Sequence, residues 1–245
     1  AKPSKPDAAP LSAKSIKNIH GVLHKALKQA VLIGYLRTNP TEACILPRII
    51  RKEMHPLEED QVAVFLREVQ GHPHEYLYKI ALFTGLREGE VLGLGWEHID
   101  FQTGTLTVKR QLRREQKKGG EYYFSPPKNN KSRCLTLAPS VIQLFRLQKL
   151  EQNSMRMEAG DAWEEHGLIF TNQTGGYLSY RTVYDCFKRI VRNIGAPATR
   201  FHDLRHTFAV ASIKSGYDIK TVQENLGHAT AAFTLDVYGH VTKQM

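Results

Sequence analysis

The chain has 245 residues and is 41% hydrophobic, which is enough apolar sequence to form a buried core and excludes global disorder. A formal charge of +10 favours a polyanionic partner, nucleic acid or an acidic membrane surface, although charge alone does not exclude a merely soluble basic protein. Cys44, Cys134 and Cys186 fit neither a disulfide framework nor a zinc motif. No apolar run is long enough to span a bilayer, so we expect a soluble, cytoplasmic protein.

The first predicted element is a long amphipathic helix within residues 11–36, with Ser12 as its N-cap. Its apolar stripe is formed by Ile16, Ile19, Leu23, Ala26, Leu27 and Ala30. Four lysines fall on the other side and indicate either a DNA-facing stripe or a solvated face: Lys14, Lys17, Lys25 and Lys28. One helix is too little to form a domain, so the chain is expected to begin partway through a small helical module.

Prolines at positions 40, 47 and 56 interrupt the pattern after this helix. We therefore expect the end of a helical domain at 1–47, a linker at 48–55 and a larger domain at 56–245. Residues 56–70 predict an amphipathic helix with acidic residues in its first turn, where the helix dipole favours them. Residues 76–100 predict a more buried helix that breaks at Gly85 and is followed by a second helix.

Residues 104–138 change from helical to alternating periodicity. The runs 104–112, 121–125 and 132–138 predict a three-stranded antiparallel sheet, with Lys128 in its second turn. Helical patterns resume at 139–150 and at 178–195, where Ser179 is the expected cap and Gly195 the stop. Short helices are expected from Phe201 onward. The predicted fold class is mainly α with a small antiparallel sheet.

The motif HDLRH contains the side chains with the most obvious chemistry. His202 and His206 are spaced like half of a zinc site, but Asp203 stands where a metalloprotease has glutamate, and Arg205 would place a fixed charge beside the metal. In the second interpretation, both histidines have a structural role and make their hydrogen bonds within the helix. The third is a phosphate site, because an arginine donates two parallel hydrogen bonds and a neutral imidazole exchanges protons near neutral pH.

Four further residues are candidates that carry little weight one at a time. Arg87 follows the Gly85 break, and Lys128 lies in a predicted turn. His228 follows Gly227, and Tyr238 comes ten residues later. An arginine near a glycine usually forms a salt bridge, and a late tyrosine usually packs in a core, so their order along the chain matters more than any single residue.

The ordered set TGLREGE, a hairpin lysine, HDLRH, LGH and TLDVYGHV resembles the tyrosine recombinase (phage integrase) family, most of all the integrases of conjugative transposons and temperate phages. The helical start followed by the dipeptide NP is similar to the core-binding module of that family. The resemblance runs from about Leu11 to the end. It implies a catalytic domain with a small sheet, preceded by part of a helical core-binding domain.

The resemblance also implies a role for each matched residue. Arg87 and Arg205 would grip the scissile phosphate, Lys128 would protonate the leaving 5′ oxygen, and Tyr238 would form a 3′-phosphotyrosyl link to DNA. His202 would help to remove the tyrosine proton, and His228 would bond to the phosphate. Lys131, in the same turn as Lys128, remains an alternative acid. Glu90 is interpreted as a structural partner, His206 as a structural neighbour, and His240 has no assigned role.

By this resemblance the protein is a site-specific recombinase that integrates or excises a mobile element without metal, ATP or another cofactor. The implied partners are double-stranded DNA and further copies of the chain, as a dimer on one site and a tetramer in synapsis, with DNA-bending or excision factors as accessories. A type IB topoisomerase and a non-catalytic DNA-binding relative remain the alternatives. A bacterial cytoplasmic location on DNA follows from this function.

DNA contacts are expected at basic positions outside the matched set. One group lies on and after the first strand and would follow phosphates: Lys109, Arg110, Arg113, Arg114, Lys117 and Lys118. Tyr180 and Arg181 open a predicted helix whose N-terminus could meet DNA, with Arg181 the better candidate for reading a base. Solvated surface charge is the alternative interpretation at each of these positions.

Overall fold

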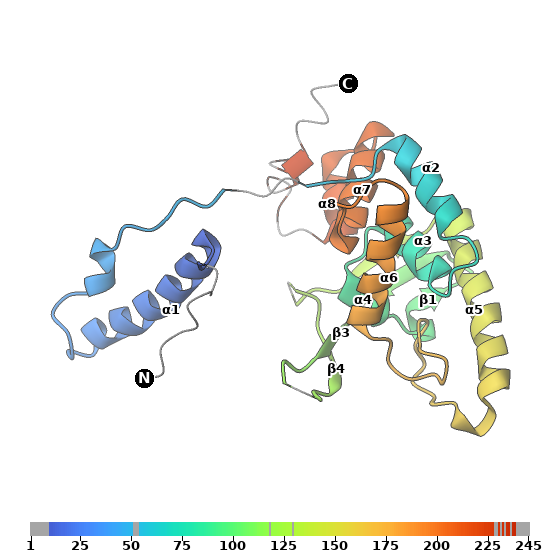
Figure 1. Ribbon diagram of the computed structural model, residues 1–245, viewed down its shortest axis with the longest axis horizontal. Helices are drawn as coiled ribbons and strands as arrows, with labels where there is room; N and C mark the ends of the chain where they lie inside the picture. The colour runs from blue at the N-terminus through green and yellow to red at the C-terminus, as the bar shows by residue number, and fades with distance from the viewer. Residues whose placement is uncertain are drawn as a thin grey trace. The chain divides into compact units, whose positions relative to one another are not determined.

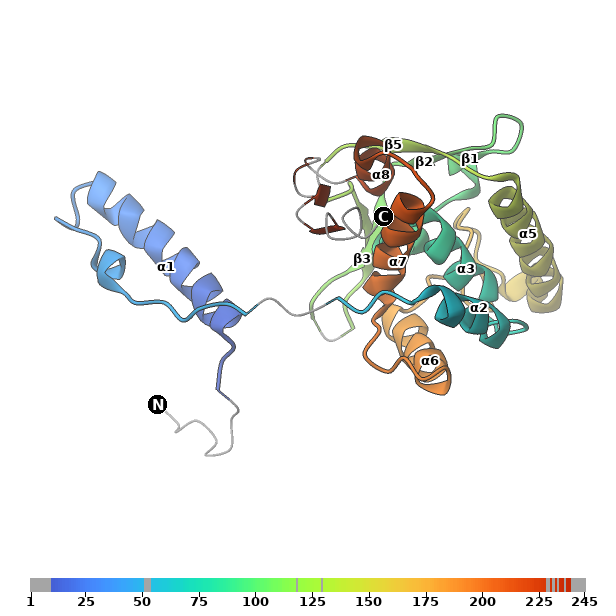
Figure 2. The same ribbon diagram turned by 90° about the horizontal axis from the view of Figure 1, so that it is seen from above.

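The structure is a computed structural model that describes residues 10–50, 54–117, 119–128, 130–227, 230, 232, 234–235 and 237–238. The chain divides into two compact units, Ala1–Glu53 and Met54–Met245, so the division falls inside the segment expected to be a linker. Figures 1 and 2 show the ribbon from two directions. Among the helices of the described residues, none combines the length and the apolar composition that a membrane span requires.

The first unit consists of one long helix and a short helical turn. Helix α1 spans Ala13–Leu32, and the Ser12 side chain accepts a hydrogen bond from the Ser15 N–H at its start, as predicted. The 3-10 turn η1 spans Pro40–Ala43 and is held to α1 through Thr41, whose carbonyl lies 3.0 Å from His20 Nε2. No residue of α1 is buried, and Leu23 of the predicted apolar stripe is 50% exposed.

The second unit is built mainly from helices. Their bounds are α2 Glu59–Glu68, α3 Glu75–Thr84, α4 Glu88–Leu92, α5 Pro139–Ala159, α6 Tyr180–Asn193, α7 Phe201–Lys214 and α8 Ile219–Leu226, with the 3-10 turns η2 Trp96–His98 and η3 Gly160–Ala162. Helix α3 contacts both α5 and α7 and lies between them in Figures 1 and 2. This arrangement places the sequence HDLRH, at the start of α7, beside the end of α3 and the start of α4.

The strands form two antiparallel sheets. Strands β1 (Ile99–Asp100), β2 (Thr105–Val108) and β5 (Arg133–Thr136) pair in the order β1-β2-β5, whereas β3 (Gln111–Arg114) pairs with β4 (Tyr122–Ser125). The expected three-stranded sheet therefore exists with different members, because β1 replaces the run 121–125 and the run 104–112 divides into two strands. Lys128 follows β4 and precedes β5, so it connects the two sheets.

The division of the run 104–112 has a local cause at Arg110. Its Nε donates to the Gly93 carbonyl at 3.0 Å, and its guanidinium lies 4.1 Å from the centroid of the Phe124 ring. These contacts turn the chain away from β2 and onto α4, where a Cβ on Gly93 would lie 2.7 Å from Leu112 N. The alternation is interrupted by three consecutive polar residues, Lys109, Arg110 and Gln111, but this does not show which strand the following residues pair with.

Aromatic side chains hold the helices of the second unit together. Phe65 of α2, Tyr78 of α3, Phe187 of α6 and Phe201 of α7 are all buried and in ring contact. Tyr78 Oη donates to the Val183 carbonyl at 2.8 Å, so the polar atom of this buried ring is satisfied. The start of α7 is thereby fixed on the main core.

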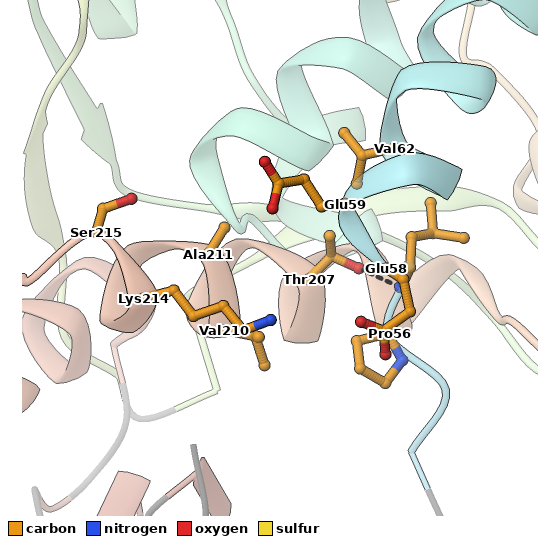
Figure 3. A pocket seen from close by; sticks show the side chains of 10 residues that line it. Pro56, Glu58, Glu59, Val62, Thr207, Val210, Ala211, Lys214 and Ser215 are labelled. Carbon is orange, nitrogen blue, oxygen red and sulfur yellow. Dashed lines mark hydrogen bonds between the residues drawn. The ribbon is translucent and has the colours of Figure 1, made fainter. Parts of the chain in front are cut away.

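The far end of α7 belongs to a second, smaller core. It consists of Ala209 and Ile213 of α7, Val222 and Leu226 of α8, and Tyr238. On another face of α7, the Leu57 N–H donates to Thr207 Oγ1 at 2.9 Å (Figure 3). The segment before α2 lies along α7 there, with a hollow beside it that Val210 and Lys214 help to line.

Candidate active site

Arg87 stands at the N-terminus of α4, where the chain resumes after the left-handed turn at Gly85 (φ 63°). A side chain at position 85 would collide with Phe208, since a Cβ there would lie 2.6 Å from its ring. Glycine is therefore required for both backbone conformation and space. Glu90 fixes Arg87 from one turn later: its Oε2 accepts from the Arg87 N–H at 3.0 Å, and its Oε1 accepts from Arg87 Nη1 at 2.8 Å.

Glu90 also binds a second arginine that the sequence did not single out. Arg133 of β5 donates from Nη1 and Nη2 to the two Glu90 oxygens at 3.0 and 2.7 Å, and its Nε donates to the Asn225 carbonyl of α8 at 2.9 Å. Burial alone raises the pKa of the fully buried Glu90 carboxyl, but hydrogen bonds and charges from Arg133 and Arg87 outweigh it and lower that pKa to about 2. Glu90 thus acts as the structural partner that was expected.

Arg205 is 2% exposed and donates to two backbone carbonyls. Nη1 bonds to Gly85 at 2.7 Å and Nη2 bonds to Leu226, so the guanidinium joins the end of α3 to the end of α8. Burial, and then the charges of Arg87 and Arg133, lower its pKa to about 9, which leaves it protonated at neutral pH. Arg87, Arg133 and Arg205 therefore bring three positive charges close to the Glu90 carboxylate.

Tyr238 is 1% exposed, and its hydroxyl lies against a histidine of α7. The distance from Tyr238 Oη to His206 Nδ1 is 2.5 Å. Burial raises the pKa of the phenol to about 12, against the lowering effect of Arg205. The resemblance assigned removal of the tyrosine proton to His202, whereas the contact described in the structure is made by His206.

His202 is exposed and lies one helical turn before His206. The two rings meet edge to face with their centroids 5.1 Å apart. Loss of water around the ring, followed by the neighbouring His206, Arg205 and Arg87, lowers the pKa of His202 to about 4. His202 is therefore neutral at neutral pH and stands on the open side of the cluster.

Asp203 lies between these histidines in sequence but is turned inward. It is fully buried and accepts three hydrogen bonds from Arg200, from the backbone N–H, Nε and Nη2, at 2.8, 2.9 and 2.7 Å. These bonds lower the pKa of its carboxyl despite burial. Its Oδ1 is 4.0 Å from His206 Nε2, so a negative charge faces the ring nitrogen that is turned away from Tyr238.

The other two predicted site residues are Lys128, which the structure describes, and His228, which it does not. Lys128 is exposed after β4, and among the described residues no hydrogen bond or ion pair links it to Arg87, Arg205 or Tyr238. His228 lies outside the described residues, as do Lys118 and His240. Gly227, the left-handed residue that ends α8, packs closely on the Arg133 side chain, since a Cβ there would lie 3.1 Å from it.

Several of the predicted DNA-contacting residues have structural partners, among them Arg114, whose Nε donates to the Gly120 carbonyl at 2.8 Å. Arg110 and Tyr180 have structural partners: Arg110 has the contacts described above, and Tyr180 Oη bonds to the Leu112 carbonyl, tying α6 to β3. Arg181 pairs with Asp185 at 2.8 Å on the surface. Lys17 is half-buried, and the remaining described candidates are exposed: Lys14, Lys25, Lys28, Lys109, Arg113, Arg114 and Lys117.

The interpretation of His202 and His206 as metal ligands would require further ligand side chains near them. In the part of the chain that the structure describes, no group of three or more His, Cys, Asp or Glu side chains could hold a metal ion. Arg200 occupies Asp203 with three hydrogen bonds, and His206 faces Tyr238. The described contacts of the motif are thus to a phenol, carbonyl oxygens and guanidinium groups.

Comparison with known proteins identifies the domain that carries this cluster. Residues 52–245 match the family described as "Phage integrase family". The chain belongs to the phage integrase family. This match begins two residues before the second compact unit and contains every member of the arginine, histidine and tyrosine cluster.

Integrase relatives align with nearly the whole chain. The XerC-like tyrosine recombinase of Caldanaerobacter subterraneus subsp. tengcongensis is 30% identical over 246 residues, covering 94% of this chain and 63% of the relative. The ICEBs1 integrase of Bacillus subtilis is 28% identical over 241 residues, covering 94% and 62%. The chain thus spans about three fifths of the length of these curated relatives.

Solved structures of integrases and recombinases have the same fold. The Tn1549 transposon integrase in complex with a circular intermediate DNA matches with a TM-score of 0.77 and 25% identity, covering 93% of this chain and 75% of that one. The XerA recombinase matches with a TM-score of 0.59 and 20% identity, covering 99% and 84%. The mainly helical fold with small antiparallel sheets is therefore the integrase fold, as the sequence predicted.

Proposed function

We propose that this phage integrase family member is a site-specific DNA recombinase that cuts and rejoins DNA strands through Tyr238 during integration or excision of a mobile element. The observation that carries the proposal is the juxtaposition of a buried tyrosine hydroxyl with an excess of positive charge. Arg205, whose charge lowers the pKa of Tyr238, is itself influenced by Arg87, Arg133 and Glu90. Glu90 supplies one negative charge for these three guanidinium groups. A phosphodiester bound there would supply a second.

The chemistry follows from what each group can do. Attack by the phenol oxygen adds negative charge to the phosphate, and Arg87 and Arg205 stabilise that charge because they are already in place. His202, on the open side beside Arg205, is neutral and able to exchange a proton with the reacting groups. We assign His228 to the phosphate, and Lys128 to protonation of the leaving 5′ oxygen.

The product of the first step is a 3′-phosphotyrosyl link between Tyr238 and DNA. Formation of this link conserves the energy of the phosphodiester bond, so the reverse attack by a 5′-hydroxyl rejoins DNA without ATP. The proposed partner is double-stranded DNA, bound by a dimer at one site and by a tetramer in synapsis, with accessory DNA-bending or excision factors. The proposed location is the bacterial cytoplasm, on DNA.

The proposal is tested by trapping the covalent intermediate. The full chain is incubated with a pool of randomised, nicked duplexes, and protein–DNA adducts that survive denaturation are recovered and sequenced. We expect adducts enriched in one sequence from the parent chain and none from Tyr238→Phe, because phenylalanine lacks the attacking oxygen. Adducts formed equally by Tyr238→Phe, or the absence of adducts from the parent chain, contradict the proposal.

A further inference from the structure

His206 holds the hydroxyl group whose oxygen must attack. Its Nδ1 lies 2.5 Å from Tyr238 Oη, and only 14% of its side chain is exposed. At this distance the phenol O–H can donate to an imidazole nitrogen that carries no hydrogen. The Tyr238 hydroxyl is therefore in contact with a nitrogen that can accept its proton when that nitrogen carries no hydrogen.

The other side of the His206 ring faces a buried negative charge. Asp203 Oδ1 is 4.0 Å from His206 Nε2, which is too long for a hydrogen bond but close enough for a strong electrostatic effect. Arg200 fixes this carboxylate with three hydrogen bonds. A negative charge on that side favours the tautomer with its hydrogen on Nε2, which leaves Nδ1 free to accept, and it stabilises the imidazolium that forms after proton transfer.

His202 is less well placed for the same task. His202 is exposed as a residue, and its ring meets that of His206 edge to face. Burial and neighbouring arginine charges lower the pKa of both histidines, and the charge of Asp203 opposes this in both. The two histidines differ in geometry, because His206 is the one whose ring nitrogen contacts the phenol oxygen.

We propose that His206, supported by Asp203, is a catalytic residue that takes the proton of Tyr238 as its oxygen attacks the scissile phosphorus. The inference rests on the proposed function. In the forward step the Oη–H bond breaks and its proton passes to Nδ1, the Oη–P bond forms, and the P–O5′ bond breaks as the leaving oxygen receives a proton from Lys128. In rejoining, the 5′-hydroxyl returns its proton to Lys128 and His206 returns its proton to Tyr238.

The test substitutes His206 with asparagine. The asparagine side-chain oxygen can take the place of Nδ1 and accept the phenol hydrogen bond, but it cannot hold a proton at neutral pH. On a duplex recovered from the randomised pool, we expect His206→Asn to form the covalent adduct about a hundredfold or more slowly, within the range that a general base contributes. The matched control is His166→Asn, an exposed histidine that stacks on Tyr177, and its rate is expected to equal that of the parent chain.

A second measurement separates proton transfer from simple loss of folding. A fluorinated tyrosine at position 238 has a lower phenol pKa and depends less on a base. It should restore much of the lost rate in His206→Asn and change the rate of the parent chain little. A His206→Asn rate within threefold of the parent chain, or a slow His206→Asn rate that the fluorinated phenol leaves unchanged, overturns the inference.

Failure of the inference is distinguishable from failure of the proposed function. If the parent chain forms adducts and His206→Asn forms them equally well, only the role of His206 is wrong. If the parent chain forms none, the fluorine NMR signal of the free protein still decides the contact on which the inference depends. We expect that signal at position 238 to shift between the parent chain and His206→Asn, and an identical signal in both proteins overturns the inference.

Discussion

Arg205 is the largest of the side chains that the structure buries almost completely, which is an unusual position for a guanidinium group. Its two hydrogen bonds go to the carbonyl oxygens of Gly85 and Leu226, so it also fixes the ends of two helices. The lowered pKa, about 9, reports that dehydration and neighbouring cations outweigh the nearby Glu90. An arginine in this state gains stability when an anion binds.

Replacement of Arg205 by lysine tests this interpretation at the scale of one residue. Lysine keeps a charge but cannot reach two carbonyls and a phosphate with one planar group. We expect Arg205→Lys to slow adduct formation by about a hundredfold or more, since loss of one such transition-state contact typically costs this much. Binding of a labelled duplex should weaken far less, because phosphate contacts elsewhere remain.

The control for Arg205→Lys is Arg156→Lys, an exposed arginine paired with Glu165 at the surface. Its rate of adduct formation should match that of the parent chain. Circular dichroism checks that Arg205→Lys is folded. If the folded variant forms adducts within threefold of the parent rate, the paired hydrogen bonds of the planar guanidinium group are not required for cleavage.

At the scale of elements, Glu90 holds α4, β5 and α8 together. It binds Arg87 within α4 and Arg133 of β5, and Arg133 continues to the Asn225 carbonyl of α8. These elements are far apart in sequence, so no local spacing of residues predicts the ion pair between Glu90 and Arg133. The sequence predicted Glu90 as a structural partner only through its place in the motif TGLREGE, and it gave no sign of Arg133.

We expect Glu90→Gln to destabilise the protein by about 3–5 kcal/mol at neutral pH, because it leaves Arg133 buried without its counter-charge. The folded-state pKa of Glu90 is about 2, below its usual value of 4.5, so its contribution is fully present above about pH 4.5. It is lost as pH falls toward 2, where Glu90 of the parent chain becomes protonated. Urea unfolding of both proteins should therefore give a difference that shrinks between pH 5 and about pH 2.

Glu97→Gln provides the matched control for Glu90→Gln. Glu97 is 67% exposed and pairs with Arg110 at 3.2 Å, so its removal should cost less than about 1 kcal/mol. Equal losses from the two substitutions, or a Glu90→Gln difference that does not depend on pH, would contradict the buried-pair interpretation.

For the whole molecule, the sequence predicted the helices well because their signals are local. Ser12 as the N-cap of α1 and the helix break at Gly85 both follow from spacing and residue type. The sheets were less predictable, because the tertiary contact between Arg110 and Gly93 separates β3 from β2, and β3 then pairs with β4. The contact between His206 and Tyr238 was missed for the same reason: it depends on how α7 and the chain after α8 pack.

The excess of positive charge in the chain predicts salt-dependent DNA binding. Lys109 and Arg113 are exposed on and next to the β3–β4 hairpin, without the structural contacts that occupy Arg110. If both contact phosphates, the double substitution Lys109→Ala with Arg113→Ala lowers the slope of log affinity against log salt by about 2. Titration of a labelled duplex at several salt concentrations measures this slope, and Arg156→Ala serves as the control with an unchanged slope. An unchanged slope in the double variant would identify these charges as solvated surface.

The most direct test of the central claim is identification of the residue that carries DNA after cleavage. Adducts from the randomised pool are digested with nuclease and trypsin, and the modified peptide is fragmented by mass spectrometry. We expect a nucleotide on the peptide 221–243, attached to Tyr238, which is its one tyrosine. A nucleotide attached to any other residue, such as Tyr217 or a threonine of the peptide 221–243, would contradict the role of Tyr238 as the nucleophile.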